Sequence, residues 1–360
     1  MLFFAPFLNV FFFLFLCVYP ERKLEPGMER STSTQGSRLE GYLPESSLGS
    51  TAVSLLFTVP IGLGMILLGT KSLDQYGWGL FVAVPYVMGF VASLIYGLRK
   101  PRSLWSCILV GCMAVSIVGL GLITLALEGA VCLVMVIPLA FPLAALGGYC
   151  GYVVQRQRWF HRGAPAFLSA LIIFMPSVQY GEHAAVMQRP TFVVCSSIDI
   201  QASPENVWKQ VVAFSEIPPP QELLFRAGVA YPIRAEIQGT GSGAARHCVF
   251  STGAFVEPIE VWDEPHLLKF SVTSNPPPME EWTPYSHIDT PHLHGFLVSV
   301  GGQFLLTPLP NGGTRLEGTT WYQHGLWPAE YWRLWSDVII HKIHMRVLRH
   351  IKEEAEGARS

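Results

Sequence analysis

The pattern of apolar and polar positions along this chain changes near residue 182. Before it, apolar residues form long runs at 48–69, 78–98, 104–127 and 130–154. A helix needs about 20 apolar residues to cross the hydrocarbon core of a bilayer. After residue 182 the apolar runs are short, partly alternating and separated by turn residues, as in strands. The pattern predicts a membrane helical region at 1–181 and a soluble domain at 190–356.

Two further apolar segments bring the expected number of membrane helices to about six. Residues 2–19 lack a basic start and a small-residue cleavage site, so we interpret them as an anchor helix and not as a signal peptide. Residues 164–180 are short for a span and contain Pro165 and Pro176. Six crossings would place the first terminus and the soluble domain on the same side of the membrane.

Positive charges in the connections predict which side that is. The segments 21–47, 99–103 and 155–163 hold ten Lys or Arg residues, whereas the alternate connections between spans hold only Lys71. Because positive connections stay inside, the soluble domain is expected to be extracytoplasmic. If 164–180 lies on the membrane surface and does not cross, the same rule makes the soluble domain cytoplasmic.

Charge also excludes some functions. Only 14% of the residues are charged, against about 25% in ordinary soluble chains. Residues 182–360 carry 13 basic and 19 acidic residues, and this acidic balance argues against a nucleic-acid partner. No Asp, His or Arg lies at the centre of a span, which argues against a transporter or pump. The expected partner is the lipid bilayer, with protein partners unknown.

The soluble half predicts an α+β fold. A strand at 191–200 is followed by a helix at 203–214, with Ser203 as N-cap and Pro204 in the first turn. Pro328 then begins a helix of about 27 residues. Between these helices lie strands at 235–239, 244–251, 255–262, 266–273, 296–307 and 314–323. This order is typical of an antiparallel sheet wrapped around a long C-terminal helix, a helix-grip domain.

Four segments carry a family resemblance. They are the strand and Ser-Pro-x-x-Val-Trp helix start at 198–208, the Gly-rich segment 239–246, the strand ending Val-Trp-Asp-Glu-Pro at 257–265, and the turn and strand start at 311–318. With the final helix, they make the soluble half similar to the START-like, SRPBCC superfamily, in its polyketide cyclase/dehydrase and lipid-transport branch. The resemblance implies an apolar cavity between the sheet and the last helix.

The final helix offers the main candidates for chemistry. At 100° per residue, Arg333, Asp337, His341 and His344 fall on one stripe. If the stripe faces the cavity it forms a polar floor, and Asp337 could orient His341 as a general base. If it faces solvent it is a surface ladder of residues four apart. The apolar face of the helix rotates along its length, so the helical wheel leaves both alternatives open.

Aromatic residues cluster around the start of this helix. Trp321 and Trp335 are candidates for the cavity wall, together with their aromatic neighbours. The alternative is an aromatic belt that leans on the membrane interface, where Trp and Tyr are enriched.

The loop 286–294 contains the candidates for a metal site. His292 and His294 have a His-x-His spacing, and Asp289 is the nearest third ligand. The alternatives are a solvated loop or a lid over the cavity mouth, and we expect no metal and no cofactor. Cys195 and Cys248 are the only two cysteines of the soluble half, and their separation leaves pairing open.

These observations lead to one hypothesis and two alternatives. The chain is expected to be a multi-pass membrane protein whose START-like domain binds an apolar small molecule or a lipid. It contains no G-x-S-x-G, P-loop, G-x-G-x-x-G or H-E-x-x-H pattern, so enzymatic activity is not the favoured hypothesis. The alternatives are a cyclase/dehydrase-type enzyme that uses His341 and Asp337, and a structural or sensing module.

Overall fold

A computed structural model describes residues 44–157, 173–185, 188–285, 288 and 290–357. The chain forms two compact units. The first contains most of four long apolar helices, and the second contains the sheet domain together with 67–81 and 119–138 from the ends of those helices. The expected anchor at 2–19 lies outside the described residues. Of the expected span 164–180, the structure describes only the end, where residues 173–184 are helical.

Four helices in the described part of the chain are long and apolar enough to cross a membrane. The first combines α2 with a π-helical end, η2, and the second begins with the π-helical turn η3 before α3. In chain order, the elements are α2 (Ser47–Leu67), η2 (Leu68–Ser72), η3 (Gly79–Ala83), α3 (Val84–Tyr96), α4 (Leu104–Thr124) and α5 (Ala130–Gln155).

Small residues let these helices approach closely. A Cβ atom on Gly147 would lie 2.0 Å from the carbonyl oxygen of Tyr86, and one on Gly151 would lie 2.7 Å from the Cβ of Ser93. Any larger side chain at either position of α5 would therefore push α3 away. This is small-xxx-small packing. In a bilayer no hydrophobic driving force brings helices together, and close packing of small residues lets them associate instead.

The second unit is built on one seven-stranded antiparallel sheet. Its strand order is β1-β7-β6-β5-β4-β3-β2, so the first strand pairs with the last and every other neighbour is sequential. The strands are β1 (Thr191–Ile200), β2 (Pro232–Gln238), β3 (Ala245–Phe250), β4 (Gly253–Asp263), β5 (Leu267–Ser271), β6 (Leu297–Pro308) and β7 (Thr314–His324).

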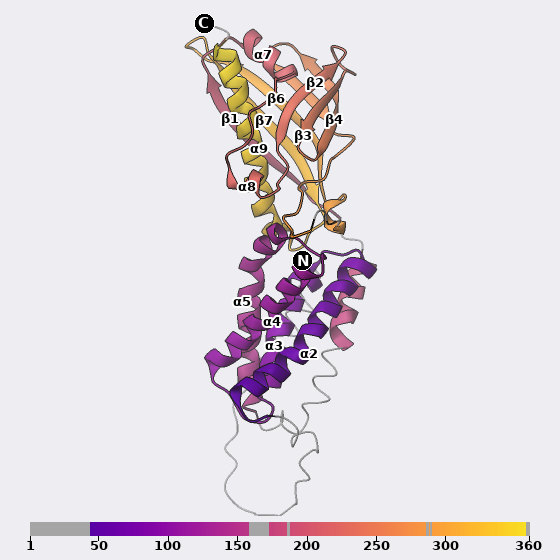
Figure 1. Cartoon of the computed structure of the whole chain (residues 1–360). Helices are drawn as coiled ribbons and strands as arrows, with labels where there is room; N and C mark the ends of the chain where they lie inside the picture. Colours follow the sequence, from indigo (N-terminus) through magenta and orange to yellow (C-terminus); the bar gives the residue numbers. More distant parts are fainter. Residues whose placement is uncertain (1–43, 158–172, 186–187, 286–287, 289, 358–360) are drawn as a thin grey trace, which may run out of the picture. The chain divides into compact units, whose positions relative to one another are not determined.

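Three α-helices accompany the sheet. The two short ones, α7 (Pro204–Val212) and α8 (Leu223–Arg226), follow β1, and α9 (Ala329–Gly357) ends the fold. Figure 1 shows α9, in yellow, running along the sheet. An antiparallel sheet gripping a long C-terminal helix, combined with apolar helices of membrane-spanning length, confirms the predicted fold class.

Apolar side chains from the sheet, α7 and α9 form the core of this domain. Val207, Trp208 and Val211 point inward from α7, and Leu348 and Ile351 from α9 meet them with no exposed surface. Burying an apolar side chain of this size stabilises the fold by about 1.5–3 kcal/mol, so these contacts fix α9 against the sheet. Earlier along α9, its buried face turns polar and borders a hollow.

Candidate functional site

A cavity of about 120 Å³ lies between the concave face of the sheet and α9. Most of its wall is aromatic or aliphatic. The polar residues of the wall include Arg246, Glu257, Gln303, Thr320 and His344. The phenylalanines of the wall are Phe214, Phe250, Phe255, Phe270 and Phe304. An apolar hollow with a small number of fixed polar groups is the usual form of a small-molecule site.

A buried ion pair forms one end of this hollow. Arg246 on β3 and Glu257 on β4 are direct cross-strand partners, and the guanidinium Nη1 donates a hydrogen bond to the Glu257 carboxylate. Only 1% of Arg246 and 6% of Glu257 is exposed. The Arg246 Nε–H donates to the carbonyl oxygen of Val212 at 3.2 Å, which ties the pair to the end of α7.

Three aromatic rings surround the guanidinium of Arg246. Its central carbon lies 5.6 Å from the ring centre of Phe214, 5.7 Å from that of Phe270 and 5.5 Å from that of Phe304. Ring faces attract a cation, and the attraction is stronger where water is excluded. The second terminal nitrogen, Nη2, is buried without a hydrogen-bond partner in the described part of the chain. The cavity therefore presents a charged group whose Nη2 has no oxygen or nitrogen acceptor, with the Cys248 thiol as the other hydrogen-bonding group beside the guanidinium.

Burial controls the ionisation of the groups around this donor. It raises the pKa of the Glu257 carboxyl above its usual range, against the opposing charge of Arg246. It also raises the pKa of the Cys248 thiol to about 12, with the negative charge of Glu257 adding to the effect. Cys248 is therefore a neutral thiol at physiological pH and a poor nucleophile, since only the thiolate is reactive.

His344 is the one member of the predicted polar stripe that lines the cavity. Its Nε2 lies 2.8 Å from Thr320 Oγ1 and its Nδ1 lies 3.1 Å from Ser196 Oγ, so two hydroxyl groups hold the ring. Burial, with a smaller electrostatic effect from His341, lowers its pKa to about 4. The imidazole is therefore neutral at physiological pH.

The other members of the stripe lie along β1 and β7 and do not line the cavity. Asp337 accepts a hydrogen bond from the Tyr322 hydroxyl at 2.6 Å and one from Arg333 Nε at 3.2 Å. His341 Nδ1 lies 2.8 Å from Ser196 Oγ. Each of these bonds joins α9 to the sheet or to itself, and none of them joins Asp337 to His341. The proposed general base thus stays a prediction that these contacts do not support.

Neither tryptophan candidate lines the cavity. Side chains alternate between the two faces of a strand, and the Thr320 hydroxyl of β7 faces His344 of α9 at 2.8 Å. Trp321, the next residue, therefore points to the opposite face, where it pairs with the half-exposed Val193 of β1. Trp335 of α9 is partly buried outside the cavity wall.

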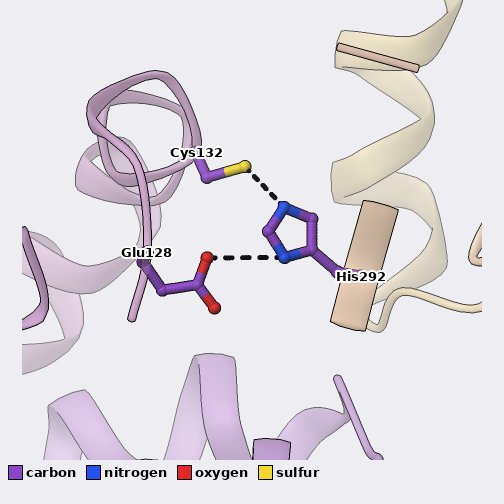
Figure 2. Close-up of side chains that lie close together, drawn as sticks. All are labelled: Glu128, Cys132 and His292. Atoms are coloured by element: carbon purple, nitrogen blue, oxygen red, sulfur yellow. Dashed lines mark hydrogen bonds and ion pairs between the residues drawn. The ribbon is translucent and has the colours of Figure 1, made fainter. Parts of the chain in front are cut away.

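The two histidines that were candidates for a metal site have different surroundings in the structure. Asp289 lies outside the described residues, and His294 is exposed. His292 instead meets two residues from the ends of the apolar helices, Glu128 and Cys132, as Figure 2 shows. The two cysteines of the soluble half are both free thiols, Cys195 exposed and Cys248 buried.

The sequence interpretation missed Arg246, Glu257 and Glu128. One signal was available in the sequence. Residues two positions apart lie on the same face of a strand, so Arg246 shares its face with the apolar Cys248 and Phe250. An arginine in that position is buried and needs a partner. Glu257 gives no comparable signal, since only the strand register places it opposite Arg246.

No protein-family model and no curated protein matches the chain. Solved structures similar to it include norcoclaurine synthase from Thalictrum flavum (14% identity, 47% of this chain and 96% of that chain, TM-score 0.30). A second is the Zhui aromatase/cyclase from Streptomyces sp. R1128 (14% identity, 48% of this chain and 97% of that chain, TM-score 0.32). A third is the Aha1 dimer from Colwellia psychrerythraea (14% identity, 47% of this chain and 99% of that chain, TM-score 0.27). At these identities and TM-scores, the similarity carries no argument about function.

The depressed pKa of His344 predicts a pH dependence of stability. The unfolded side chain binds a proton near pH 6.5 and the folded one only near pH 4, so unfolding takes up a proton between these values. Lowering the pH from 7 to 4 should therefore reduce the free energy of unfolding by about 3 kcal/mol through this residue.

The measurement is the melting temperature of the full-length protein in detergent between pH 4 and 7. A His344→Gln variant should lose part of the acid destabilisation, whereas His341→Gln, on the exposed side of the same helix, should retain it. Equal pH profiles for His344→Gln and the unmodified protein would contradict the assignment.

Proposed function

We propose that this chain is a multi-pass membrane protein whose helix-grip domain binds a small aromatic molecule carrying an acidic or other hydrogen-bond-accepting group. The observation that carries the proposal is the buried Arg246 Nη2, which has no partner and borders a phenylalanine-lined cavity. A buried donor without a partner costs about 1–3 kcal/mol, and more when it is charged. A ligand that accepts this hydrogen bond removes that cost.

The size of the cavity favours a compact ligand. A dry cavity of about 150 Å³ in another protein holds one benzene molecule, whereas drug-sized ligands occupy about 300–1,000 Å³. The 120 Å³ found here is of the same order as that benzene-sized cavity and well below the drug-sized range. A lipid chain would need α9 or the surrounding loops to move, so within the expected ligand class we favour the apolar small molecule over the lipid.

The wall of the cavity supports an aromatic ligand in particular. Phe250 and Phe255 pack edge to face with ring centres 4.8 Å apart. Phe270 and Phe304 lie next to each other beside the guanidinium, with ring centres 6.3 Å apart. Such rings offer favourable edge and face contacts to another ring. A carboxylate or phenolate on that ring would meet Arg246 Nη2 in a charge-assisted hydrogen bond, which is about twice as strong as a neutral one.

An enzymatic role is the alternative, and His344 is the residue that would support it. A titratable group with a strongly shifted pKa in a cavity is a candidate for catalysis. Both of its ring nitrogens, however, already face hydroxyl groups of the sheet. Binding without turnover accounts for this arrangement more simply, because a general base needs a free nitrogen directed at its substrate.

The location of the domain relative to the membrane is part of the proposal. The four apolar helices support membrane anchoring. The positive connections and the expectation of six crossings support an extracytoplasmic domain.

Filling the cavity should abolish binding. Val347 of α9 lines the hollow and is 7% exposed, whereas Val338 on the same helix is 53% exposed. Val347→Phe should eliminate binding of 4-fluorobenzoate to the full-length protein, and Val338→Phe should leave it unchanged. Broadening of the fluorine NMR signal, corrected with protein-free micelles, measures the binding. Undiminished broadening with a folded Val347→Phe protein would refute the cavity as the ligand site.

Cys195 allows a direct test of the side on which the domain lies. It is exposed on β1, so a membrane-impermeant thiol reagent should label it in intact cells if the domain is extracytoplasmic. A Cys195→Ser variant measures the background from the remaining cysteines. Labelling that depends on Cys195 only after the cells are permeabilised would place the domain in the cytoplasm.

A further inference from the structure

A second group of polar side chains gathers where the ends of the apolar helices join the sheet unit. Glu128 lies in the turn between α4 and α5, and Cys132 lies in the first turn of α5. His292 lies in the short 3-10 helix η4 (Pro291–Leu293), and Glu281 lies in the segment between β5 and η4. All four belong to the same compact unit, so their mutual positions are part of one folded body.

The two nitrogens of His292 face different partners, as Figure 2 shows for Glu128 and Cys132. Nε2 lies 2.9 Å from Cys132 Sγ and 3.5 Å from a carboxylate oxygen of Glu281. Nδ1 lies 3.4 Å from a carboxylate oxygen of Glu128. Cys132 and Glu281 thus both lie beside Nε2, and the Glu128 carboxylate lies beside Nδ1.

Glu281 is the member of this group that most needs explanation. Its side chain has no exposed surface, and among the described residues no nitrogen or hydroxyl group donates a hydrogen bond to either carboxylate oxygen, so the Cys132 thiol is the hydrogen-bonding group beside it. A buried carboxylate without hydrogen bonds is costly, and proteins place one where it pairs with a cation or binds a metal. His292 is the only cation-forming side chain within ion-pair distance of it among the described residues.

The local fold holds Glu281 in this position. A Cβ atom on Gly129 would lie 2.0 Å from a Glu281 carboxylate oxygen, so only glycine leaves room for that carboxylate. The Ala130 N–H donates to the carbonyl oxygen of Trp282 at 2.9 Å, and the Tyr285 hydroxyl donates to the carbonyl oxygen of Thr124. These contacts fix the segment that carries Glu281 against the start of α5.

Neighbouring side chains hold Glu128 beside His292. The Tyr76 hydroxyl donates to its second carboxylate oxygen at 3.4 Å, and the Tyr76 ring lies edge-on to His292 with ring centres 5.3 Å apart. Lys71 is a further positive charge that acts on Glu128. In metal sites, a histidine ligand usually directs its other ring nitrogen at a carboxylate, which fixes the tautomer and the ring orientation.

The geometry points to a site for a zinc-type divalent cation, with Cys132 Sγ, His292 Nε2 and Glu281 as ligands and Glu128 as the residue that orients His292. Thiolate, imidazole and carboxylate together are a ligand set that zinc takes, and three protein ligands leave a fourth tetrahedral position open. This site shares no residue with the proposed ligand cavity.

The two distances from His292 Nε2 to the other ligand atoms can be compared with those that a tetrahedral ion requires. With a metal-to-nitrogen distance of about 2.0 Å and a metal-to-sulfur distance of about 2.3 Å, the nitrogen and sulfur would lie about 3.5 Å apart, and the nitrogen and oxygen about 3.4 Å apart. The observed separations are 2.9 and 3.5 Å. A small outward rotation of the Cys132 side chain is enough to admit the ion. The two positive charges of the ion would then balance the thiolate and the Glu281 carboxylate.

The test uses the full-length protein in detergent, stripped with a chelator and titrated with zinc and, in parallel, with cobalt. We expect one zinc per chain by elemental analysis and a thiolate-to-cobalt charge-transfer band in the near ultraviolet. Cys132→Ser and His292→Ala should lose both, and Glu128→Gln should bind about 10–100-fold more weakly. Zinc should also raise the melting temperature of the unmodified protein, because an ion that binds only the folded state stabilises it.

Matched controls separate a metal site from a buried hydrogen-bond network. Cys112→Ser and His294→Ala change a second cysteine and a second histidine and should bind zinc normally. Cys132→His exchanges one zinc ligand for another and should retain binding, so a loss with Cys132→Ser but not Cys132→His supports coordination. Absence of zinc binding in the unmodified protein, or unchanged affinity in folded Cys132→Ser, would overturn the proposal.

Discussion

The arrangement of the helix-grip domain depends on a charge that is almost fully removed from water. Arg246 points inward from β3, and Glu257 lies directly opposite it on β4. Removing one partner of a buried pair costs about 3–5 kcal/mol, because the other charge is left uncompensated. The register of β3 against β4, the end of α7 and three phenylalanine rings all contribute to holding the guanidinium. The ion pair and the three phenylalanine rings also line the hollow beside it.

The long C-terminal helix serves two separate purposes along its length. Its last turns bury Leu348 and Ile351 in the core, and its middle turns bring His344 and Val347 to the cavity wall. The polar stripe from Arg333 to His341 runs beside the cavity, where it bonds to β7 and β1. The helix therefore closes the cavity with one face and is fastened to the sheet by the neighbouring one.

Sequence patterns were sufficient for the architecture but not for the site. Apolar run length and turn residues predicted apolar helices followed by an antiparallel sheet and a closing helix, and the fold class is confirmed. The helical wheel could not place the stripe, because the apolar face of α9 rotates along the helix. The contact between Cys132 and His292 joins positions 160 residues apart, and no local spacing encodes it. Chemistry that depends on strand register or on such distant contacts has to be read from the structure.

The most direct test of the central claim, that Arg246 recognises the acidic group of a ligand, compares benzoate with benzyl alcohol. A double variant, Arg246→Met with Glu257→Leu, replaces the ion pair by apolar groups of similar volume, a change that is often neutral for stability. In the unmodified full-length protein, benzoate should bind about tenfold more tightly, as a charge-assisted hydrogen bond of about 1.5 kcal/mol or more requires. The double variant should fold and bind both probes equally. An undiminished preference for benzoate in that variant would contradict the account.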